Sequence, residues 1–369
     1  MIKNFDTVFL HPQLENHPRT RALVERIPHR KLESTDRLEE LSRRRKEQPS
    51  SSVVRSKYNL ALMPYKGRMV EACPASPGMK CCRYRVINLV SGCPLDCSYC
   101  VLQGYLNRPV INVYPDLEKV FAEVDEELAA GAPHPLRYGT GELSDSLALD
   151  HLLGFSTDLV KFFGERPGCW FELKTKSVNV GNLLELDCAP ENVVVSWSVN
   201  PQVVIDSEES GAPGLAQRLV AARKVQDKKF RLGFHFDPIF NFEGWEDHYR
   251  QVVRDIYAVA APGSVAWISL GCLRFSAWLA PYYHERFGRH PLLAGELNPV
   301  PPDGKYRYPQ PVRIDIYRKM YRWIREFDRE VYVYLCMENE AAFRWALGME
   351  VGEDDLAVER GFPAPPGWK

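Results

Sequence analysis

The sequence has no long apolar run, no signal-peptide pattern and no excess of charge of either sign. No stretch approaches the ~18 consecutive apolar residues of a membrane-spanning helix. The first residues, Met1–Asp6, lack the basic-then-apolar order of a signal peptide. We therefore expect a cytoplasmic protein without membrane contact. The formal net charge of −1 over 369 residues gives no overall attraction to nucleic acid, so such binding requires a local patch.

The ten cysteines are spread over a large chain, which favours reduced thiols over a disulfide framework. Cys93, Cys97 and Cys100 are separated by three and then two residues, and no second Cys/His knuckle follows. Ferredoxin loops use two-residue gaps and a fourth cysteine before Pro. Three thiolates can instead hold one iron–sulfur cluster and leave one iron open to activate a small molecule. The spacing predicts a catalytic cluster, with zinc or buried structural cysteines as alternatives.

Apolar β-rich runs alternate with helical stretches from residue 84 onward. The predicted strands are Tyr84–Val90, Leu136–Thr140, Trp170–Lys174, Val193–Ser198, Phe230–Phe236 and Val265–Leu270. The predicted helices are Pro115–Ala130, Ser146–Phe163, Pro213–Gln226 and Trp245–Val259. This alternation predicts an α/β protein with a parallel sheet and right-handed crossovers, arranged as a partial (β/α)6 TIM-like barrel. The cysteine loop follows the first strand and therefore lies at the barrel mouth.

We place this barrel at residues 81–275, between two extensions. The N-terminal extension, residues 1–80, carries the basic cluster Arg43–Lys46. A charged helix is predicted there at Ser34–Glu47, either as a solvated surface helix or as a phosphate-binding patch.

The C-terminal extension, residues 276–369, is expected to cap the open edge of the barrel with α/β structure. It is predicted to hold a helix at Val312–Phe327, a strand at Val331–Leu335 and a final helix. Its aromatic residues are interleaved with arginines, as around Tyr306 and Tyr317. Such residues either stack on nucleic-acid bases or form a core with a basic outer face.

The cysteine spacing after a first barrel strand is the signature of radical S-adenosylmethionine (AdoMet) enzymes. The chain further resembles the spore photoproduct lyase family, whose members repair DNA by returning the spore photoproduct to two thymines. The resemblance runs from about Phe9 to Asp255. It is carried by Cys100–Gln103, Ser144–Asp145, Leu149–Leu152, Thr175–Lys176, Asn179–Val180, Ser198–Asn200, Ala221–Val225, Gly233–Phe234 and Glu243–Glu246.

This resemblance implies a [4Fe-4S] cluster whose open iron chelates AdoMet, which is cleaved to a 5′-deoxyadenosyl radical after one-electron reduction. Ser144, Lys176 and Ser198 match cofactor-holding positions of the family, and a Lys ammonium can pair with the AdoMet carboxylate. Gly139 and Gly141 either form a strand-to-helix turn or let the backbone approach the cofactor. The implied partners are damaged or modified DNA and a low-potential electron donor such as flavodoxin or ferredoxin. We expect a monomer.

Two positions depart from the family pattern. The match places Glu142 where the family has its hydrogen-donor cysteine, and Val101 where it has a relay tyrosine, although Tyr99 is retained. A carboxylate cannot give up a hydrogen atom as a thiol can, so the return of hydrogen or the lesion must differ. Cys272, just past the sixth predicted strand, is a candidate replacement donor, and Cys336 is a weaker one.

The fifth predicted strand carries His235 and Asp237, two residues apart and so on one face. They are predicted to bind substrate or move a proton, or else to form a satisfied structural pair. With Glu142 they suggest an acidic mouth suited to a substrate with amine or amide donors. The alternatives to DNA are RNA, a peptide or a small molecule, and, as another class, a cluster that senses iron or redox state.

Overall fold

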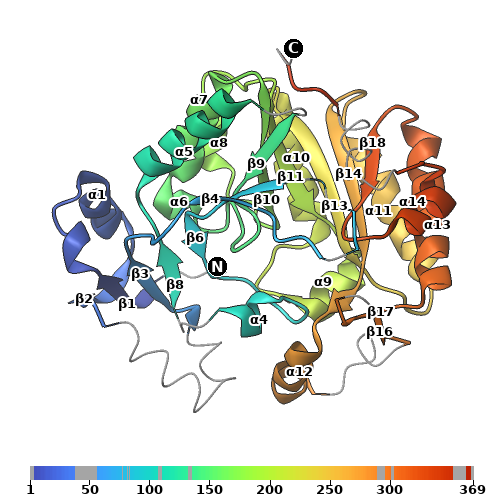
Figure 1. Cartoon of the computed structure of the whole chain (residues 1–369), viewed down its shortest axis with the longest axis horizontal. Coiled ribbons are helices and arrows are strands. Elements are labelled where there is room, and N and C mark those ends of the chain that lie inside the picture. The colour runs from blue at the N-terminus through green and yellow to red at the C-terminus, as the bar shows by residue number, and fades with distance from the viewer. Residues whose placement is uncertain are drawn as a thin grey trace.

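The computed structural model describes residues 4–37, 56–76, 78–80, 82, 84–106, 110–131, 135–288, 296–300, 303–351 and 363–366. Its main element is a strongly curved sheet of eight strands in the order β18-β14-β13-β11-β10-β9-β5-β4 (Figure 1). The strands are β4 (Val70–Ala72), β5 (Tyr84–Ile87), β9 (Leu136–Gly139), β10 (Cys169–Thr175), β11 (Val193–Ser198), β13 (Arg231–Ile239), β14 (Val265–Cys272) and β18 (Tyr332–Leu335).

Seven strands of this sheet, β5, β9, β10, β11, β13, β14 and β18, pair in parallel with one another. The edge strand β4 pairs antiparallel with β5. The six predicted barrel strands correspond to β5, β9, β10, β11, β13 and β14, which are adjacent and in chain order. The predicted partial barrel is therefore confirmed.

Helices cover the outer face of this sheet (Figure 1). They are α5 (Leu117–Ala130), α6 (Asp150–Leu153), α7 (Phe155–Gly164), α8 (Gly181–Leu184), α10 (Leu215–Asp227) and α11 (Trp245–Val259). The short helix α9 (Gln202–Glu208) instead contacts the strand Glu209–Ser210 that follows it. The single helix predicted at Ser146–Phe163 is wrong. It is split into α6 and α7 because Gly154, with φ +69°, adopts a left-handed conformation between them.

A second sheet joins the N-terminal extension to the segment around the cysteine loop. Its order is β2-β1-β3-β8-β6, with β1 (Phe5–Leu10), β2 (His29–Ser34), β3 (Asn59–Leu62), β6 (Val90–Ser91) and β8 (Ile111–Val113). Ser34 ends strand β2, where it pairs with Leu10. The helix predicted to begin at Ser34 is wrong at its start, because this residue completes a parallel strand pair. Residues 38–55, with the basic cluster Arg43–Lys46, lie outside the described residues.

The C-terminal extension continues the barrel sheet, because β18 pairs in parallel with β14, the last of the six predicted barrel strands. Before it come β15 (Arg274–Phe275), η2 (Ala277–Leu279), α12 (Ala280–Phe287), β16 (Asn298–Val300), β17 (Lys305–Arg307) and α13 (Gln310–Phe327), and after it α14 (Glu340–Leu347). Tyr308, Tyr317 and Trp323 are buried, which supports a core role for these aromatic residues. The proposed domain boundaries stay a prediction. Within the described ranges, no helix combines the length and the apolar character that a membrane crossing requires.

Candidate active site

The cysteine loop follows β6 and forms one wall of the barrel mouth. It begins at Gly92, whose φ of +106° and whose approach to Ile111 leave no room for a side chain. Within it, β7 (Asp96–Cys97) pairs antiparallel with β12 (Glu209–Ser210), so that Cys97 lies opposite Glu209. The loop is thereby attached to the segment that follows α9.

The three thiols of this loop share one neighbourhood. Cys97 is buried, while Cys93 and Cys100 are partly exposed. Burial, followed by Asp145, raises the pKa of Cys93 to about 12, and Cys100 contributes to the same rise. Among the described residues, no three His, Cys, Asp or Glu side chains close around a single metal ion. A multi-iron cluster separates its thiolates further than one ion does, so the all-sulfur donor set at this spacing fits a cluster.

Lys176 extends from the loop after β10 toward the cysteine loop. Its ammonium lies 5.7 Å from the centre of the Tyr99 ring, and it makes no hydrogen bond or ion pair with any described residue. Burial lowers the pKa of Lys176, but Glu209 and Cys97 outweigh burial and the pKa is raised. The site therefore holds a partly buried, charged ammonium beside the three thiols, with its donors free for an anionic ligand.

A buried network fixes the surroundings of this lysine. The Tyr99 hydroxyl donates to Glu209 Oε1 at 2.6 Å, and Asn200 Nδ2 donates to the same oxygen at 2.9 Å. Arg218, fully buried, pairs with the other Glu209 oxygen and donates to the carbonyl of Ser198 at 3.0 Å. The hydrogen bond to Glu209 thus fixes the position of Tyr99 at the barrel mouth.

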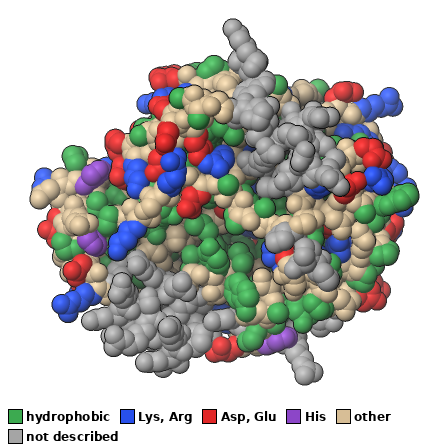
Figure 2. Space-filling model, in the orientation of Figure 1, with side chains coloured by type: hydrophobic (Ala, Val, Ile, Leu, Met, Phe, Trp, Pro, Cys, Tyr) green, Lys and Arg blue, Asp and Glu red, His purple; other side chains and the backbone are tan. Residues whose placement is uncertain are grey.

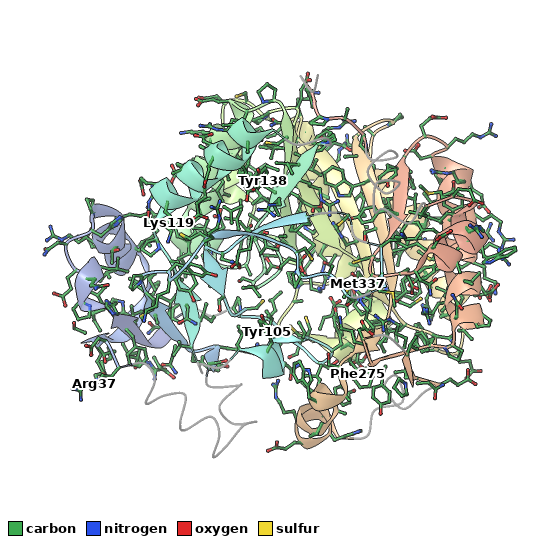
Figure 3. All side chains as sticks on the ribbon, viewed as in Figure 1. Arg37, Tyr105, Lys119, Tyr138, Phe275 and Met337 are labelled. Carbon is green, nitrogen blue, oxygen red and sulfur yellow. The ribbon has the colours of Figure 1, made fainter. Side chains whose placement is uncertain are left out.

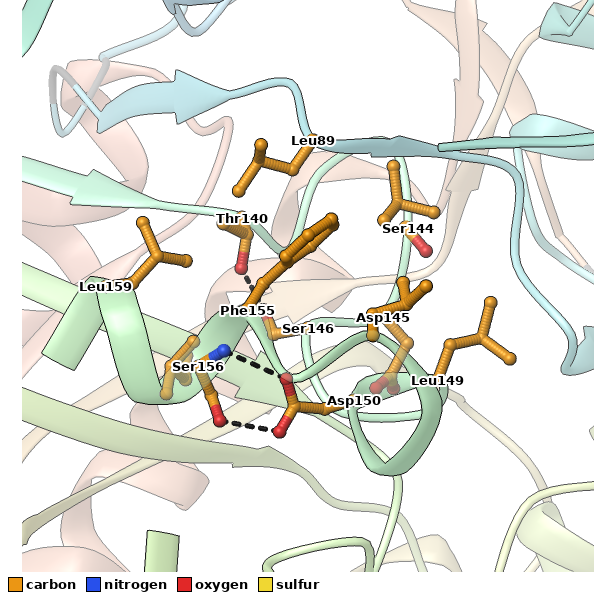
Figure 4. A pocket seen from close by; sticks show the side chains of 13 residues that line it. Leu89, Thr140, Ser144, Asp145, Ser146, Leu149, Asp150, Phe155, Ser156 and Leu159 are labelled. Carbon is orange, nitrogen blue, oxygen red and sulfur yellow. Dashed lines mark hydrogen bonds between the residues drawn. The ribbon is translucent and has the colours of Figure 1, made fainter. Parts of the chain in front are cut away.

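Ser144 and Asp145 lie in the loop after β9, where predicted. The Ser144 hydroxyl donates to the Gly92 carbonyl at 2.7 Å, which joins this loop to the start of the cysteine loop. Asp145 accepts from the Thr175 hydroxyl at 2.5 Å and from the Lys176 amide at 2.6 Å. Behind the loop a cavity of about 20 Å³ is lined by both residues and by Asp150, which accepts two hydrogen bonds from Ser156 (Figure 4). This space is sufficient for about one water molecule.

The structure gives the two glycines a packing role. A Cβ at Gly139 would lie 1.8 Å from the Tyr84 hydroxyl, and one at Gly141 would lie 2.8 Å from Cβ of Lys174. Ser198 is buried at the end of β11, and its carbonyl is held by Arg218. Cofactor binding by Gly139, Gly141 and Ser198 stays a prediction.

Each acidic residue predicted at the mouth has a basic partner. Lys174 Nζ donates to Glu142 at 2.6 Å, and Arg274 donates to both Asp237 oxygens at 2.9 and 3.1 Å. The prediction of an acidic mouth is therefore wrong, because a basic side chain neutralises each of the two carboxylates.

His235 does not pair with Asp237. Its Nε2 lies 2.8 Å from Oε1 of Glu172, deeper in the barrel. The two residues share a strand face, but side chains two positions apart lie at different depths of the barrel and meet different partners.

Cys272 lies on the outer side of the barrel. Gly271 points inward, since a Cβ there would lie 2.7 Å from Asp237 Oδ1, and the next residue of a strand points the other way. The Cys272 thiol instead interacts with Tyr317 of α13. The hypothesis that it reaches the mouth is wrong.

Cys336, directly after β18, lies on the inner side. Arg274 Nη2 donates to its sulfur at 3.5 Å, and the same guanidinium holds Asp237. Burial, followed by Asp237, raises its pKa well above the ordinary value, and Glu142 contributes to this rise. Met337, labelled in Figure 3, follows Cys336 and accepts from Arg274 Nε at 3.2 Å.

A family model described as spore photoproduct lyase matches residues 5–269. The chain belongs to the spore photoproduct lyase family. It is 33% identical over 173 residues to the spore photoproduct lyase of Geobacillus sp. (strain Y412MC61) and 31% identical over 175 residues to that of Bacillus subtilis (strain 168). These matches cover 46% and 47% of this chain, and the chain spans about half the length (50%) of these curated family members.

The family fold is also found in solved structures. A spore photoproduct lyase complexed with dinucleoside spore photoproduct has a TM-score of 0.77 and 24% identity, over 90% of this chain and 98% of that chain. A mutant with bound AdoMet and dinucleoside spore photoproduct has a TM-score of 0.76 at the same identity and coverage. These likenesses confirm the partial barrel with its extensions.

Sequence reasoning missed several residues that organise this family site. Glu209 accepts from Tyr99 and is paired with Arg218, and Glu172 contacts His235. Lys57 and Arg286 contact the cysteine loop from the two extensions. The one available signal was the adjacent pair Glu208 and Glu209 at the end of an apolar helix, where buried carboxylates require partners.

Proposed function

We propose that this protein is a radical AdoMet lyase that acts on a DNA lesion. The observation that carries the proposal is the unpaired Lys176 ammonium beside the three-thiol loop, in a chain of the spore photoproduct lyase family. A [4Fe-4S] cluster on Cys93, Cys97 and Cys100 would supply the electron for reductive cleavage of AdoMet. Relatives named for this lesion, and a solved structure with AdoMet and photoproduct bound, support both the cofactor and the substrate class.

In this proposal Lys176 binds the AdoMet carboxylate, because its three donors are unused and it is partly buried. Ser144 and Ser198 complete the cradle from β9 and β11. Glu142, exposed at the mouth and held by Lys174, contacts the substrate. Tyr99 positions Lys176 through its ring and through Glu209. His235, in contact with Glu172, and Asp237, paired with Arg274, shape the interior of the barrel.

We further propose that the return of hydrogen is altered. Glu142 and Val101 stand where the family has its donor cysteine and relay tyrosine. Cys336 is a described thiol on the inner side of the barrel, with Glu142 and Asp237 as electrostatic neighbours. A thiol kept protonated can give its hydrogen atom to a substrate carbon radical. The C–H bond forms and the S–H bond breaks, which leaves a thiyl radical on Cys336. A soluble low-molecular-weight thiol then restores Cys336 by giving up its own hydrogen atom, and two of the resulting thiyl radicals combine to a disulfide.

The proposed partner is DNA, whose lesion must leave the base stack to reach the barrel mouth. Extruding a lesion from the stack is least costly where pairing is already disturbed. Val101, Tyr105 and Trp278 are large exposed hydrophobic residues, and apolar side chains gather over α4 (Leu102–Tyr105) and α12 on the face shown in Figure 2. A low-potential flavodoxin or ferredoxin as electron donor, a monomeric state and a cytoplasmic location stay predictions.

The proposed function is tested by anaerobic reconstitution followed by assay for 5′-deoxyadenosine, with and without ultraviolet-damaged DNA. Damaged DNA is expected to stimulate cleavage and to be repaired. Cleavage that responds to RNA, a peptide or a metabolite but not to DNA would support the alternative substrates. A loaded cluster without any AdoMet cleavage would support a sensor.

Replacing Lys176 with Met is expected to weaken AdoMet binding about 10- to 100-fold. A hydrogen bond to a charged group contributes about 1.5–3 kcal/mol, and each 1.4 kcal/mol is about tenfold in Kd. Equilibrium dialysis with the reconstituted protein measures the change. Lys161→Met, on the exposed surface of α7, is the control. An unchanged Kd for Lys176→Met would remove Lys176 from the cofactor site.

Replacing Cys336 with Ala is expected to leave 5′-deoxyadenosine formation intact and to lower the yield of repaired DNA at least about tenfold, since the proposed hydrogen source is lost. In D2O the wild-type product should carry deuterium from the exchangeable thiol. Cys188→Ala, which removes an exposed thiol, is the control. Equal yield and equal deuterium content in Cys336→Ala would exclude Cys336 as the donor.

A further inference from the structure

The N-terminal extension reaches the cysteine loop through one buried lysine. Lys57, just before β3, has a side chain only 14% exposed. Its ammonium donates to the carbonyl of Cys93 at 3.2 Å and to the carbonyl of Leu95. Lys57 therefore fixes the first turn of the loop and places a positive charge directly against it.

The C-terminal extension reaches the same loop from another element. Arg286 of α12 has a side chain 6% exposed and donates to Gln103 Oε1 at 2.6 Å and to Asp96 Oδ2 at 2.5 Å. Gln103 in turn donates to the carbonyls of Cys97 at 2.5 Å and Ser98 at 2.8 Å. Arg286 thus holds the second half of the loop, directly and through an amide.

Asp96 connects the two cations. Lys57 Nζ lies 3.4 Å from its Oδ1, while Arg286 binds its Oδ2. The aspartate itself lies inside the cysteine motif, next to Cys97. Two buried cations and one carboxylate therefore contact the loop of three thiols, and these three side chains together carry one net positive charge.

We propose that Lys57, Asp96 and Arg286 form a clamp that positions the cysteine loop and sets the reduction potential of the cluster it holds. This inference rests on the proposed function, because it requires the cluster. Reduction adds a negative charge to the cluster, and cations held in a poorly solvated environment favour that charge. Fixed charges and hydrogen bonds around the sulfurs are established determinants of cluster potential. The two extensions thereby take part in the chemistry of the barrel mouth.

The clamp predicts shifts of opposite sign in anaerobically reconstituted full-length protein. Lys57→Gln and Arg286→Gln each remove a positive charge, so the midpoint potential, measured by redox titration with electron paramagnetic resonance, should fall. Asp96→Asn removes the negative charge, so the potential should rise. Lys57→Arg keeps the charge and should restore the wild-type potential. Lys31→Gln, on the exposed strand β2, is the control.

If the three residues had a merely structural role, the shift in midpoint potential would not have opposite signs in the lysine and aspartate variants. If all three variants lose iron to the same extent and the remaining clusters keep the wild-type potential, the inference is overturned while the proposed function stands. The same conclusion follows if Asp96→Asn and Lys57→Gln shift the potential in the same direction. If the wild-type protein assembles no cluster, both the inference and the proposed function are wrong.

Discussion

Replacing Cys97 with Ala is expected to abolish cluster assembly and, with it, all AdoMet cleavage. Cys97 is the buried member of the three thiols, and its backbone pairs with Glu209 of β12. Two remaining thiolates cannot hold a cluster against solvent. The loss of cluster binding should therefore exceed the ~10- to 100-fold loss of metal affinity that follows when a metal ligand loses its hydrogen-bond partner. Iron and acid-labile sulfide per chain, measured after anaerobic reconstitution, report the effect directly.

The fold should survive this change, which makes the test specific. The β7–β12 pairing is made by backbone groups, and Ser98 also bonds Glu208 through its amide at 2.8 Å. Circular dichroism and the unfolding midpoint should therefore match the wild type. Cys188→Ala, which removes an exposed thiol, should keep full iron content. Wild-type iron and cleavage in Cys97→Ala would mean that the ligands lie elsewhere.

The barrel could be predicted because the apolar pattern of its strands and helices is local and periodic in the sequence. Strand β11 was predicted with its observed limits, Val193–Ser198, since it is a short run rich in Val and Trp. The N-terminal sheet could not be predicted in the same way. Its strands β1, β3 and β8 come from distant parts of the chain, and Ile111–Val113 is too short to carry a periodic pattern.

The candidate site could be predicted where the chain has a motif and not where side chains meet across strands. The spacing of Cys93, Cys97 and Cys100 is visible in the sequence. The choice between Cys272 and Cys336 depended on which side of β14 faces inward, and the structure shows this because a Cβ at Gly271 would meet Asp237. In the same way, the partner of His235 is Glu172, 63 residues away, and no local pattern identifies it.

Replacing Glu172 with Gln is expected to lower the free energy of unfolding by about 3–5 kcal/mol at pH 7, the cost of breaking a buried ion pair from one side. Glu172 is completely buried and accepts hydrogen bonds from Ser196 and from Trp267 Nε1, at 2.5 and 2.8 Å. His235 and Arg137 are its charged or polar neighbours, and Arg137 is itself only 5% exposed. Glutamine fills the same volume but removes the buried negative charge that faces Arg137 and His235.

The pH dependence gives this prediction a second signature. Burial raises the pKa of Glu172, but His235 and Arg137 outweigh burial and hold the pKa far below its usual value. A carboxyl whose folded-state pKa is depressed stabilises the fold above its unfolded-state pKa of about 4.3, and this contribution is lost as pH falls toward the folded-state pKa. In urea titrations the difference between wild type and Glu172→Gln should therefore shrink by about 1.4 kcal/mol per pH unit below about pH 4. Glu185→Gln, at an exposed position, should show no difference. A difference that persists undiminished at pH 3 would mean that lost packing, and not the lost charge, destabilises the variant.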